Sequence, residues 1–318
     1  TMVRAGAGEL YLAGGAESAS TAPLRFWPGD PPVRYERAPF APAGYPDPEM
    51  GEAAEAVAAA AGIDRARQDR YAARSHAAAV AADFSAELVA VDTGAPATAA
   101  PTGSAPTDPT GSASTVWFDR DERPRGGLTV QRLARLRPAF VPGGTVTAGN
   151  SCGVSDGAAA VAVVSERLRA AHGWPGLRVL ATATCGADPG HPGTGLVPAV
   201  RSVLDRHGVA AGDLAAVEIT EAFAGQVLAC VDALGIDERV VCAEGGAIAL
   251  GHPWGASGAI LMVRLFGRLV RAAAAGVDPG PAVVGDDYHG PRYGLAACAV
   301  GGGMGVATLV ELADPEHS

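Results

Sequence analysis

A histidine set among glycines is the strongest chemical signal in this sequence. His252 lies in the stretch GGAIALGHPWGASGA, residues 245–259, just ahead of a helix that we expect from about residue 256. Glycines let a ligand approach the backbone closely, and the free amides at a helix start favour an anion. A histidine held there can act as a general base or donate to an oxyanion. The alternative is a core histidine bonded to a carbonyl. A phosphate loop is not favoured, because neither the Rossmann nor the P-loop spacing is met.

Cys298 is the second candidate, in the stretch AACAVGGGMGVATLVE, residues 296–311. A cysteine ahead of a glycine turn and an alternating apolar strand could take part in chemistry or only lie beside it. The chain has five cysteines, which are far apart and form no CxxC pair: Cys152, Cys185, Cys230, Cys242 and Cys298. This spacing predicts neither a disulfide framework nor a metal site. Each cysteine could instead serve as a small apolar residue buried in the core.

The composition narrows the class of protein. Of the 318 residues, 48% are apolar and only 18% are charged, which predicts a globular chain with a large interior. The net charge of −10 argues against non-specific binding of nucleic acid or of a membrane surface, which both need basic patches. No apolar run reaches the roughly 18 residues of a spanning helix, and the start TMVRAGAGEL has no signal-peptide core. We therefore expect a cytoplasmic protein.

From about residue 140 onward, apolar strands alternate with helices, which predicts an α/β layered fold. Expected strands include GTVTAGN (residues 144–150), GAAAVAVVSE, LRVLATATCG and LAAVEIT, with a helix near 196–207. Ahead of them, residues 49–85 predict two helices, the first closed by Gly62 and the second capped by Asp64. Residues 93–115 are rich in Pro, Ala, Thr and Gly and predict a flexible surface linker.

Seven stretches follow one another in order from about residue 5 to residue 312: LAGGAESAS, MGEAAEAVA, DERPRGGLTVQRLARLRPAF, GTVTAGNSCGVSDGAAAVAVVSE, EITEAFAGQ, GGAIALGHPWGASGA and GLAACAVGGGMGVATLVE. Together they resemble the thiolases, which transfer acyl groups between coenzyme A thioesters and a cysteine. The resemblance implies two similar α/β halves stacked as five layers (αβαβα), with a loop domain inserted in the first half. Residues 1–19 and 136–172 would belong to an incomplete N-terminal half, 20–135 to the loop domain, and 173–318 to the C-terminal half.

The resemblance also implies roles for single residues. His252 matches the family histidine, and Thr220 stands where the family has an asparagine that holds a water in an oxyanion hole. Cys152 replaces a serine close to pantetheine. Arg125 lies near the nucleotide end of coenzyme A, where a guanidinium suits phosphate, although a bare arginine in a polar loop is otherwise a solvated charge. Gly301 and Ser257 are also expected to contact the substrate.

The acid/base cysteine of the family is out of register in this chain. Aligned from Gly294 and Leu295 on one side and GGGMG on the other, its position falls on Ala299, and Cys298 comes one residue early. Side chains of neighbouring residues on a strand point to opposite faces of the sheet. Cys298 should therefore point away from the pocket, unless a β-bulge shifts the register.

Other positions also depart from the family. Its nucleophilic cysteine belongs to a helix ahead of RAGAGELYLAGG, and TMVRAG reads as the last turn of such a helix. We therefore expect a preceding segment, or a partner chain, to supply the nucleophile. Glu49 stands where thiolases often place a histidine. His289, in GDDYHG, could be an added site residue or a metal ligand, or only part of a polar loop.

The expected function is that of an acyltransferase of the acetyl-CoA acetyltransferase type, acting on acyl-CoA thioesters by Claisen condensation or thiolysis. The thioester is the substrate, no cofactor is permanently bound, and homodimers or tetramers are usual in the family. This chain alone should be inactive. Two alternatives stay open: a catalytically degenerate subunit that binds coenzyme A thioesters within a hetero-oligomer, and a thiolase-like retro-aldolase or decarboxylase.

Overall fold

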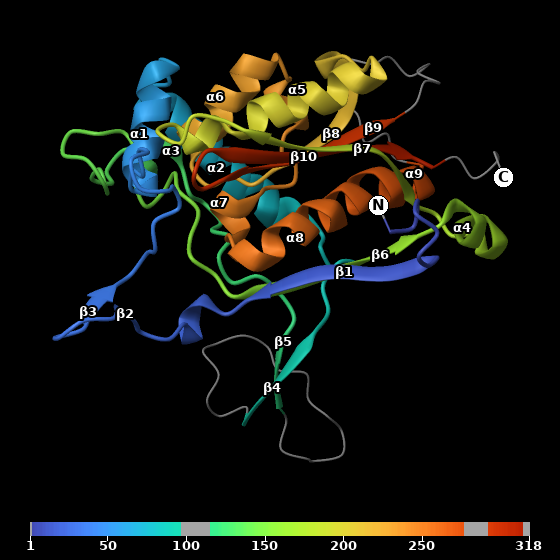
Figure 1. The fold of residues 1–318 in the computed structure, drawn as a ribbon. Helices are drawn as coiled ribbons and strands as arrows, with labels where there is room; N and C mark the ends of the chain where they lie inside the picture. Colours follow the sequence, from blue (N-terminus) through green and yellow to red (C-terminus); the bar gives the residue numbers. More distant parts are fainter. Residues whose placement is uncertain (1, 97–114, 277–291, 314–318) are drawn as a thin grey trace.

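The computed structural model describes residues 2–96, 115–276 and 292–313, and its helices and strands form stacked layers (Figure 1). A four-stranded sheet has the order β7–β10–β9–β8. Strand β10 runs antiparallel to both of its neighbours, and β8 runs parallel to β9. The strands of this sheet are β7 (Leu177–Gly186), β8 (Leu214–Ile219), β9 (Tyr293–Val300) and β10 (Met304–Leu312).

Helix α8 lies between this sheet and a second, two-stranded sheet in which β1 pairs antiparallel with β6 (Figure 1). The bounds are α8 (Trp254–Phe266), β1 (Leu10–Glu17) and β6 (Gly157–Val164). The helix contacts β1 and β6 on one side and β8 and β9 on the other. Because elements pack on both sides of it, its sequence is apolar nearly all round. The predicted helix is confirmed.

Close backbone packing joins the layers at two glycines. A Cβ atom on Gly15 of β1 would lie 1.8 Å from the carbonyl oxygen of Gly255, in the first turn of α8. A Cβ atom on Gly305 of β10 would lie 2.0 Å from the carbonyl oxygen of Gly195, at the start of α5. Any side chain at either position would push two elements apart, which explains the glycines there.

Helices α5 and α6 lie over the other face of the four-stranded sheet, and α1 and α2 lie at its end (Figure 1). Helix α5 contacts β7, β9 and β10, α1 packs on α6, and α2 packs on α6 and α7. The two helices predicted within residues 49–85 are confirmed, and the Asp64 carboxylate caps the second by accepting from the Arg67 amide at 2.6 Å. The helices are α1 (Met50–Ala60), α2 (Arg65–Ala81), α3 (Val130–Leu133), α4 (Glu166–His172), α5 (Leu196–His207), α6 (Ala224–Leu234), α7 (Ala247–Leu250) and α9 (Ala272–Ala274).

The two faces of β9 have different neighbours. Leu295 and Ala297 belong to the main apolar core, which includes buried residues of α5 and α6, and Ala299 packs against the same core. Ala296 faces α8 in a smaller cluster with Leu265. Pairing with β10 is regular from Tyr293 to Val300, so alternation places Cys298 on the face of Ala296.

The predicted strand over residues 144–150 is wrong. The amides of Thr145 and Val146 each donate to the Glu55 carboxylate of α1 at 2.8 Å, and the Thr147 amide donates to the Asn150 side chain at 2.8 Å. The Glu55 side chain, far away in the sequence, and the nearby Asn150 side chain therefore satisfy backbone groups that a neighbouring strand would have used.

Two hairpin-like strand pairs lie away from the layers (Figure 1). They are β2 (Arg25–Trp27) with β3 (Val33–Tyr35), and β4 (Val91–Pro96) with β5 (Thr115–Phe118). Residues 93–96 and 115, at the ends of the predicted linker, therefore lie in strands, while 97–114 and His289 lie outside the described residues. In the described ranges, no helix combines the length and apolarity needed to cross a membrane, and no side-chain cluster is suited to hold a metal ion.

Candidate active site

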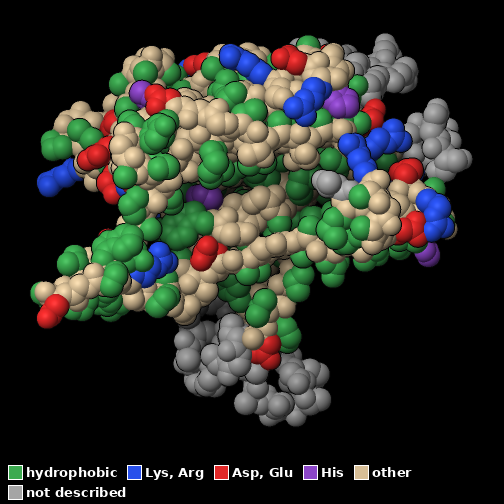
Figure 2. Space-filling view, viewed as in Figure 1, with side chains coloured by type: hydrophobic (Ala, Val, Ile, Leu, Met, Phe, Trp, Pro, Cys, Tyr) green, Lys and Arg blue, Asp and Glu red, His purple; other side chains and the backbone are tan. Residues whose placement is uncertain are grey.

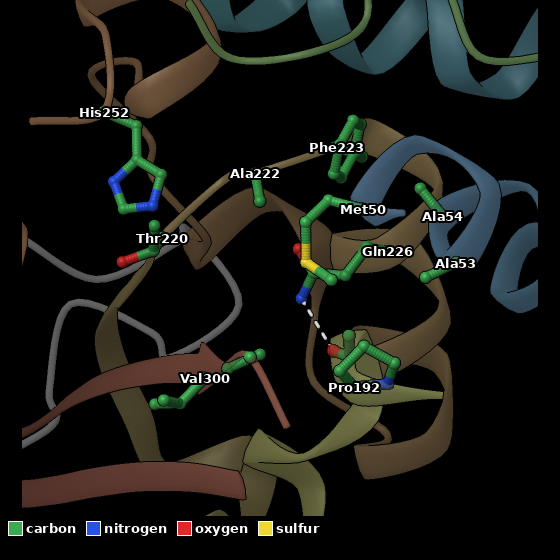
Figure 3. Close-up of a pocket in the computed structure, with 13 residues that line it drawn as sticks. Met50, Ala53, Ala54, Pro192, Thr220, Ala222, Phe223, Gln226, His252 and Val300 are labelled. Carbon is green, nitrogen blue, oxygen red and sulfur yellow. Dashed lines mark hydrogen bonds between the residues drawn. The ribbon is translucent and has the colours of Figure 1, made fainter. Parts of the chain in front are cut away.

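A pocket lies where the end of β9 meets α1, α6 and the loops after β8 and α7. Figure 2 shows a hollow between the layer of α5 and the layer of β1, with apolar side chains around it. The close-up in Figure 3 shows the pocket itself. The residues that line it are Met50, Ala53 and Ala54 of α1, Pro192 and Gly193, Thr220, Ala222 and Phe223 after β8, Gln226 of α6, His252, and Ala299, Val300 and Gly301.

His252 sits in the short connection between α7 and α8, where Gly251 adopts a φ of +105°. Its amide donates to the Gly153 carbonyl at 3.1 Å, and its Nδ1 lies 2.6 Å from the hydroxyl of Ser257 in α8. Ser257 thus holds the ring in place and leaves Nε2 without a hydrogen bond among the described residues. Burial lowers the pKa of His252 from 6.5 to about 4, so the ring is neutral at pH 7 and can accept a proton.

Thr220 follows β8 and places a hydroxyl in the pocket wall beside His252 (Figure 3). The side chain is buried, and its Oγ1 makes no well-formed hydrogen bond within the described parts of the chain. The Cys298 thiol lies close to this hydroxyl. Burial raises the pKa of that thiol, and the nearby Thr220 hydroxyl lowers it in part. An unpaired hydroxyl at this place is available to a ligand or a water.

Ala299 lines the pocket, whereas Cys298 does not. The Cys298 thiol donates instead to the backbone carbonyl of Ala299 at 3.2 Å. Because the raised pKa keeps this thiol protonated at pH 7, Cys298 is also a poor nucleophile. The acid/base role of Cys298 stays a prediction that this geometry does not favour.

Substitutions at these two neighbours are expected to differ sharply. Ala299→Leu pushes three more carbons into the pocket, where overpacking costs about 1–3 kcal/mol, and should weaken thioester binding about tenfold or more. Cys298→Ala removes a thiol that lies near Thr220 but does not line the pocket, and should alter binding by less than about twofold. Isothermal titration with acetoacetyl-CoA measures both, and the reverse order of effects would show that the register assigned to β9 is wrong.

Glu221 is a buried carboxylate that ties the pocket segments together. It accepts from the Tyr71 hydroxyl at 2.8 Å and the Ser75 hydroxyl at 2.9 Å, both on α2, and from the Ile248 amide of α7 at 3.1 Å. Burial raises its pKa, and these donors offset part of that rise. Glu221 therefore joins Thr220, its neighbour in sequence, to the segment that carries His252. The sequence analysis missed this residue, although an acid between an apolar strand and an apolar helix is a visible signal.

The remaining predicted site residues divide into two groups. Gly301 lines the pocket, and Ser257 lies behind it, bonded to His252. Cys152 and Arg125 do not line it. The Cys152 amide donates to the Ala222 carbonyl at 2.9 Å, and burial raises the pKa of its thiol to about 11. The exposed Arg125 donates its amide to His76 Nδ1 at 3.2 Å. Their contacts with coenzyme A remain predictions.

Glu49 also points elsewhere: its carboxylate pairs with Arg37 at 3.2 Å, and the next residue, Met50, lines the pocket instead. Sequence reasoning did not predict the wall formed by Met50, Phe223 and Gln226. Of these three residues, only Gln226 could have been recognised in the sequence, as a polar residue within the apolar helix sequence AGQVLACVDAL.

Comparison with known proteins gives consistent matches over most of the chain. Residues 1–167 match the family described as "Thiolase, N-terminal domain", and residues 175–279 match "Thiolase, C-terminal domain". A putative acetyl-CoA C-acetyltransferase VraB of Staphylococcus haemolyticus is 38% identical over 98% of this chain and 73% of its own length. An acetyl-CoA acetyltransferase of Pseudomonas aeruginosa is 36% identical over 96% of this chain and 73% of its own length.

Solved structures agree with these sequence matches. The crystal structure of the Bacillus anthracis acetyl-CoA acetyltransferase has a TM-score of 0.76 at 29% identity, covering 98% of this chain and 74% of its own. The human mitochondrial 3-ketoacyl-CoA thiolase in complex with CoA also has a TM-score of 0.76 at 29% identity, covering 98% of this chain and 73% of its own. The α/β fold implied by the sequence is confirmed.

Proposed function

The chain belongs to the thiolase family, and on that premise we propose that it acts in acyl transfer on acyl-CoA thioesters, with the acyl group in the pocket described above. The observation that carries the proposal is the neutral His252, held by Ser257 in the wall of a pocket that Thr220 and Gly301 also line. The ring is neutral near pH 7, so its free Nε2 can accept a proton from a thiol, and the thiolate that forms beside it would stabilise the protonated ring.

The proposed chemistry uses these groups in order. His252 Nε2 takes the proton of an attacking thiol, and the thiolate sulfur forms a bond to the thioester carbonyl carbon. The negative charge that develops on the carbonyl oxygen is stabilised by hydrogen bonds from the protonated ring or from a water held by Thr220. When the bond to the coenzyme A sulfur breaks, the imidazolium returns its proton to the leaving thiolate. Coenzyme A is thus a substrate, and no permanently bound cofactor enters the scheme.

The acylated nucleophile in this proposal comes from outside these 318 residues, from a further segment or a second polypeptide. In support, none of the five cysteines lines the pocket. Burial also raises the pKa of Cys152 to about 11 and that of Cys230 to about 12, which leaves both thiols protonated and unreactive. We propose in addition that the protein is cytoplasmic and works as a homodimer or tetramer.

Ala299 and Thr220, which stand where the family has a cysteine and an asparagine, support a second candidate function. The pocket presents a methyl group where the family carries its acid/base thiol, so a proton on the α-carbon has no thiol partner there. A subunit that binds coenzyme A thioesters without Claisen chemistry, or a retro-aldolase or decarboxylase, needs no such thiol.

Binding and acylation measurements test the proposal directly. Isothermal titration should show that the chain binds acetoacetyl-CoA, while mass spectrometry after incubation with acetyl-CoA should find no acylated cysteine on it. Thiolysis of acetoacetyl-CoA should appear once a further segment or a partner chain that carries a nucleophilic cysteine is supplied. Absence of thioester binding would refute the proposal. Binding without thiolysis, combined with cleavage of β-hydroxyacyl or β-ketoacyl thioesters into other products, would establish the second candidate.

A further inference from the structure

We propose that this pocket selects thioesters whose acyl chain carries a hydroxyl group, and that the amide oxygen of Gln226 recognises this hydroxyl. The inference rests on the proposed function, because it takes the pocket as the acyl site. It adds the chemical class of the acyl group.

In the Gln226 side-chain amide, the nitrogen has a hydrogen-bond partner and the oxygen has none among the described residues. Its Nε2 donates to the Gly193 carbonyl at 3.0 Å, the bond drawn in Figure 3, and approaches the Cys230 sulfur at 3.7 Å. The opposite amide orientation would place two acceptor oxygens against each other, so the nitrogen must face Gly193. The other atom, Oε1, is buried and has no hydrogen-bond partner among the residues that the structure describes. Gln226 as a residue is only 2% exposed.

The surroundings of this oxygen suggest that a bound ligand supplies its hydrogen-bond donor. The wall around Gln226 is apolar and consists of Met50, Ala53, Ala54, Pro192 and Phe223. A buried acceptor without a donor costs about 1–3 kcal/mol, and a bound group that donates to it removes that cost. No charged side chain of the described residues lines the pocket, so a ligand ammonium would stay uncompensated and a carboxylate would face an acceptor. A hydroxyl is the neutral donor that we propose for the acyl chain.

The position of Gln226 also indicates where on the acyl chain the hydroxyl lies. His252 and Thr220 lie together on one side of the pocket, and Gln226 lies on the other, with Met50 and Pro192 (Figure 3). A thioester carbonyl held near His252 therefore directs its acyl chain toward Gln226. The hydroxyl is expected on carbon 3 or further along the chain, because carbon 2 stays at the reacting side.

Two ligands of nearly equal shape test the inference. 3-Hydroxybutyryl-CoA and 3-methylbutyryl-CoA differ by a hydroxyl in place of a methyl, and the methyl leaves Oε1 without a donor while excluding water. By isothermal titration, the unmodified chain should bind the hydroxylated thioester about tenfold more tightly. Gln226→Leu keeps the size of the side chain but removes the amide, and should abolish or reverse this preference.

Controls separate recognition from stability and from the proposed function. Gln68 is fully buried, also has an unpaired Oε1 and does not line the pocket, so Gln68→Leu should keep the preference. Gln226→Met supplies a second variant without an amide, should thermal unfolding show that Gln226→Leu is not folded. Equal affinities in the unmodified chain, or a preference that survives loss of the amide, would overturn the inference. If neither thioester binds, the proposed function fails, and the inference fails with it.

Discussion

Between pH 6.5 and pH 4, the chain is expected to lose roughly 3 kcal/mol of folding stability that a His252→Gln variant keeps. In the folded chain, burial lowers the pKa of His252 from 6.5 to about 4. Below pH 6.5, the unfolded chain therefore binds a proton that the folded chain does not, and the equilibrium shifts toward unfolding. The loss ends near pH 4, where the folded chain also takes up the proton. Urea unfolding at half-unit pH steps measures this difference.

A second histidine provides the control for this measurement. His207 is exposed at the end of α5, and His207→Gln should leave the pH dependence of the unmodified chain in place. Parallel curves for the unmodified chain and His252→Gln would mean that His252 is not buried in its neutral form, and its role as a base near pH 7 would lose its support.

Glu221→Ala is expected to destabilise the fold by about 3–5 kcal/mol, because it leaves buried donors on two helices without an acceptor. These donors are the hydroxyls of Tyr71 and Ser75 and the amide of Ile248. The loop before His252 should loosen as well, since the Ile248 amide is its link to Glu221. The free energy of unfolding from urea titration, followed by intrinsic fluorescence, measures the loss.

Two variants show whether the hydrogen bonds cause this effect. Glu221→Gln keeps an acceptor oxygen of the same reach, and should cost clearly less than Glu221→Ala. Glu52→Ala removes an exposed carboxylate from the first turn of α1 and should change stability by no more than about 0.5 kcal/mol. A loss below about 1 kcal/mol for Glu221→Ala would show that these hydrogen bonds do not hold the pocket segments together.

Local signals in the sequence were sufficient for much of the fold. Glycines around His252, the cap at Asp64 and the helical periodicity of residues 49–85 act over a few residues, so each predicted its element without knowledge of the rest. The order of the motifs likewise indicated the family that the comparisons confirm. Residues 144–150 are the counterexample, because the Thr145 and Val146 amides bond to Glu55, about ninety positions away in the sequence, and no local pattern shows that.

The sequence by itself determined the family, the alternation of strands and helices, and the residue types available at His252, Thr220 and Ala299. Only the tertiary structure decided which of them share a pocket. The regular pairing of β9 with β10 places Ala299 at the pocket wall and Cys298 on the other face. Packing of α6 against the turn at Gly193 leaves one oxygen of Gln226 unpaired. Such features depend on contacts between distant segments, and hydrogen bonds formed in three dimensions leave no periodic trace in the chain.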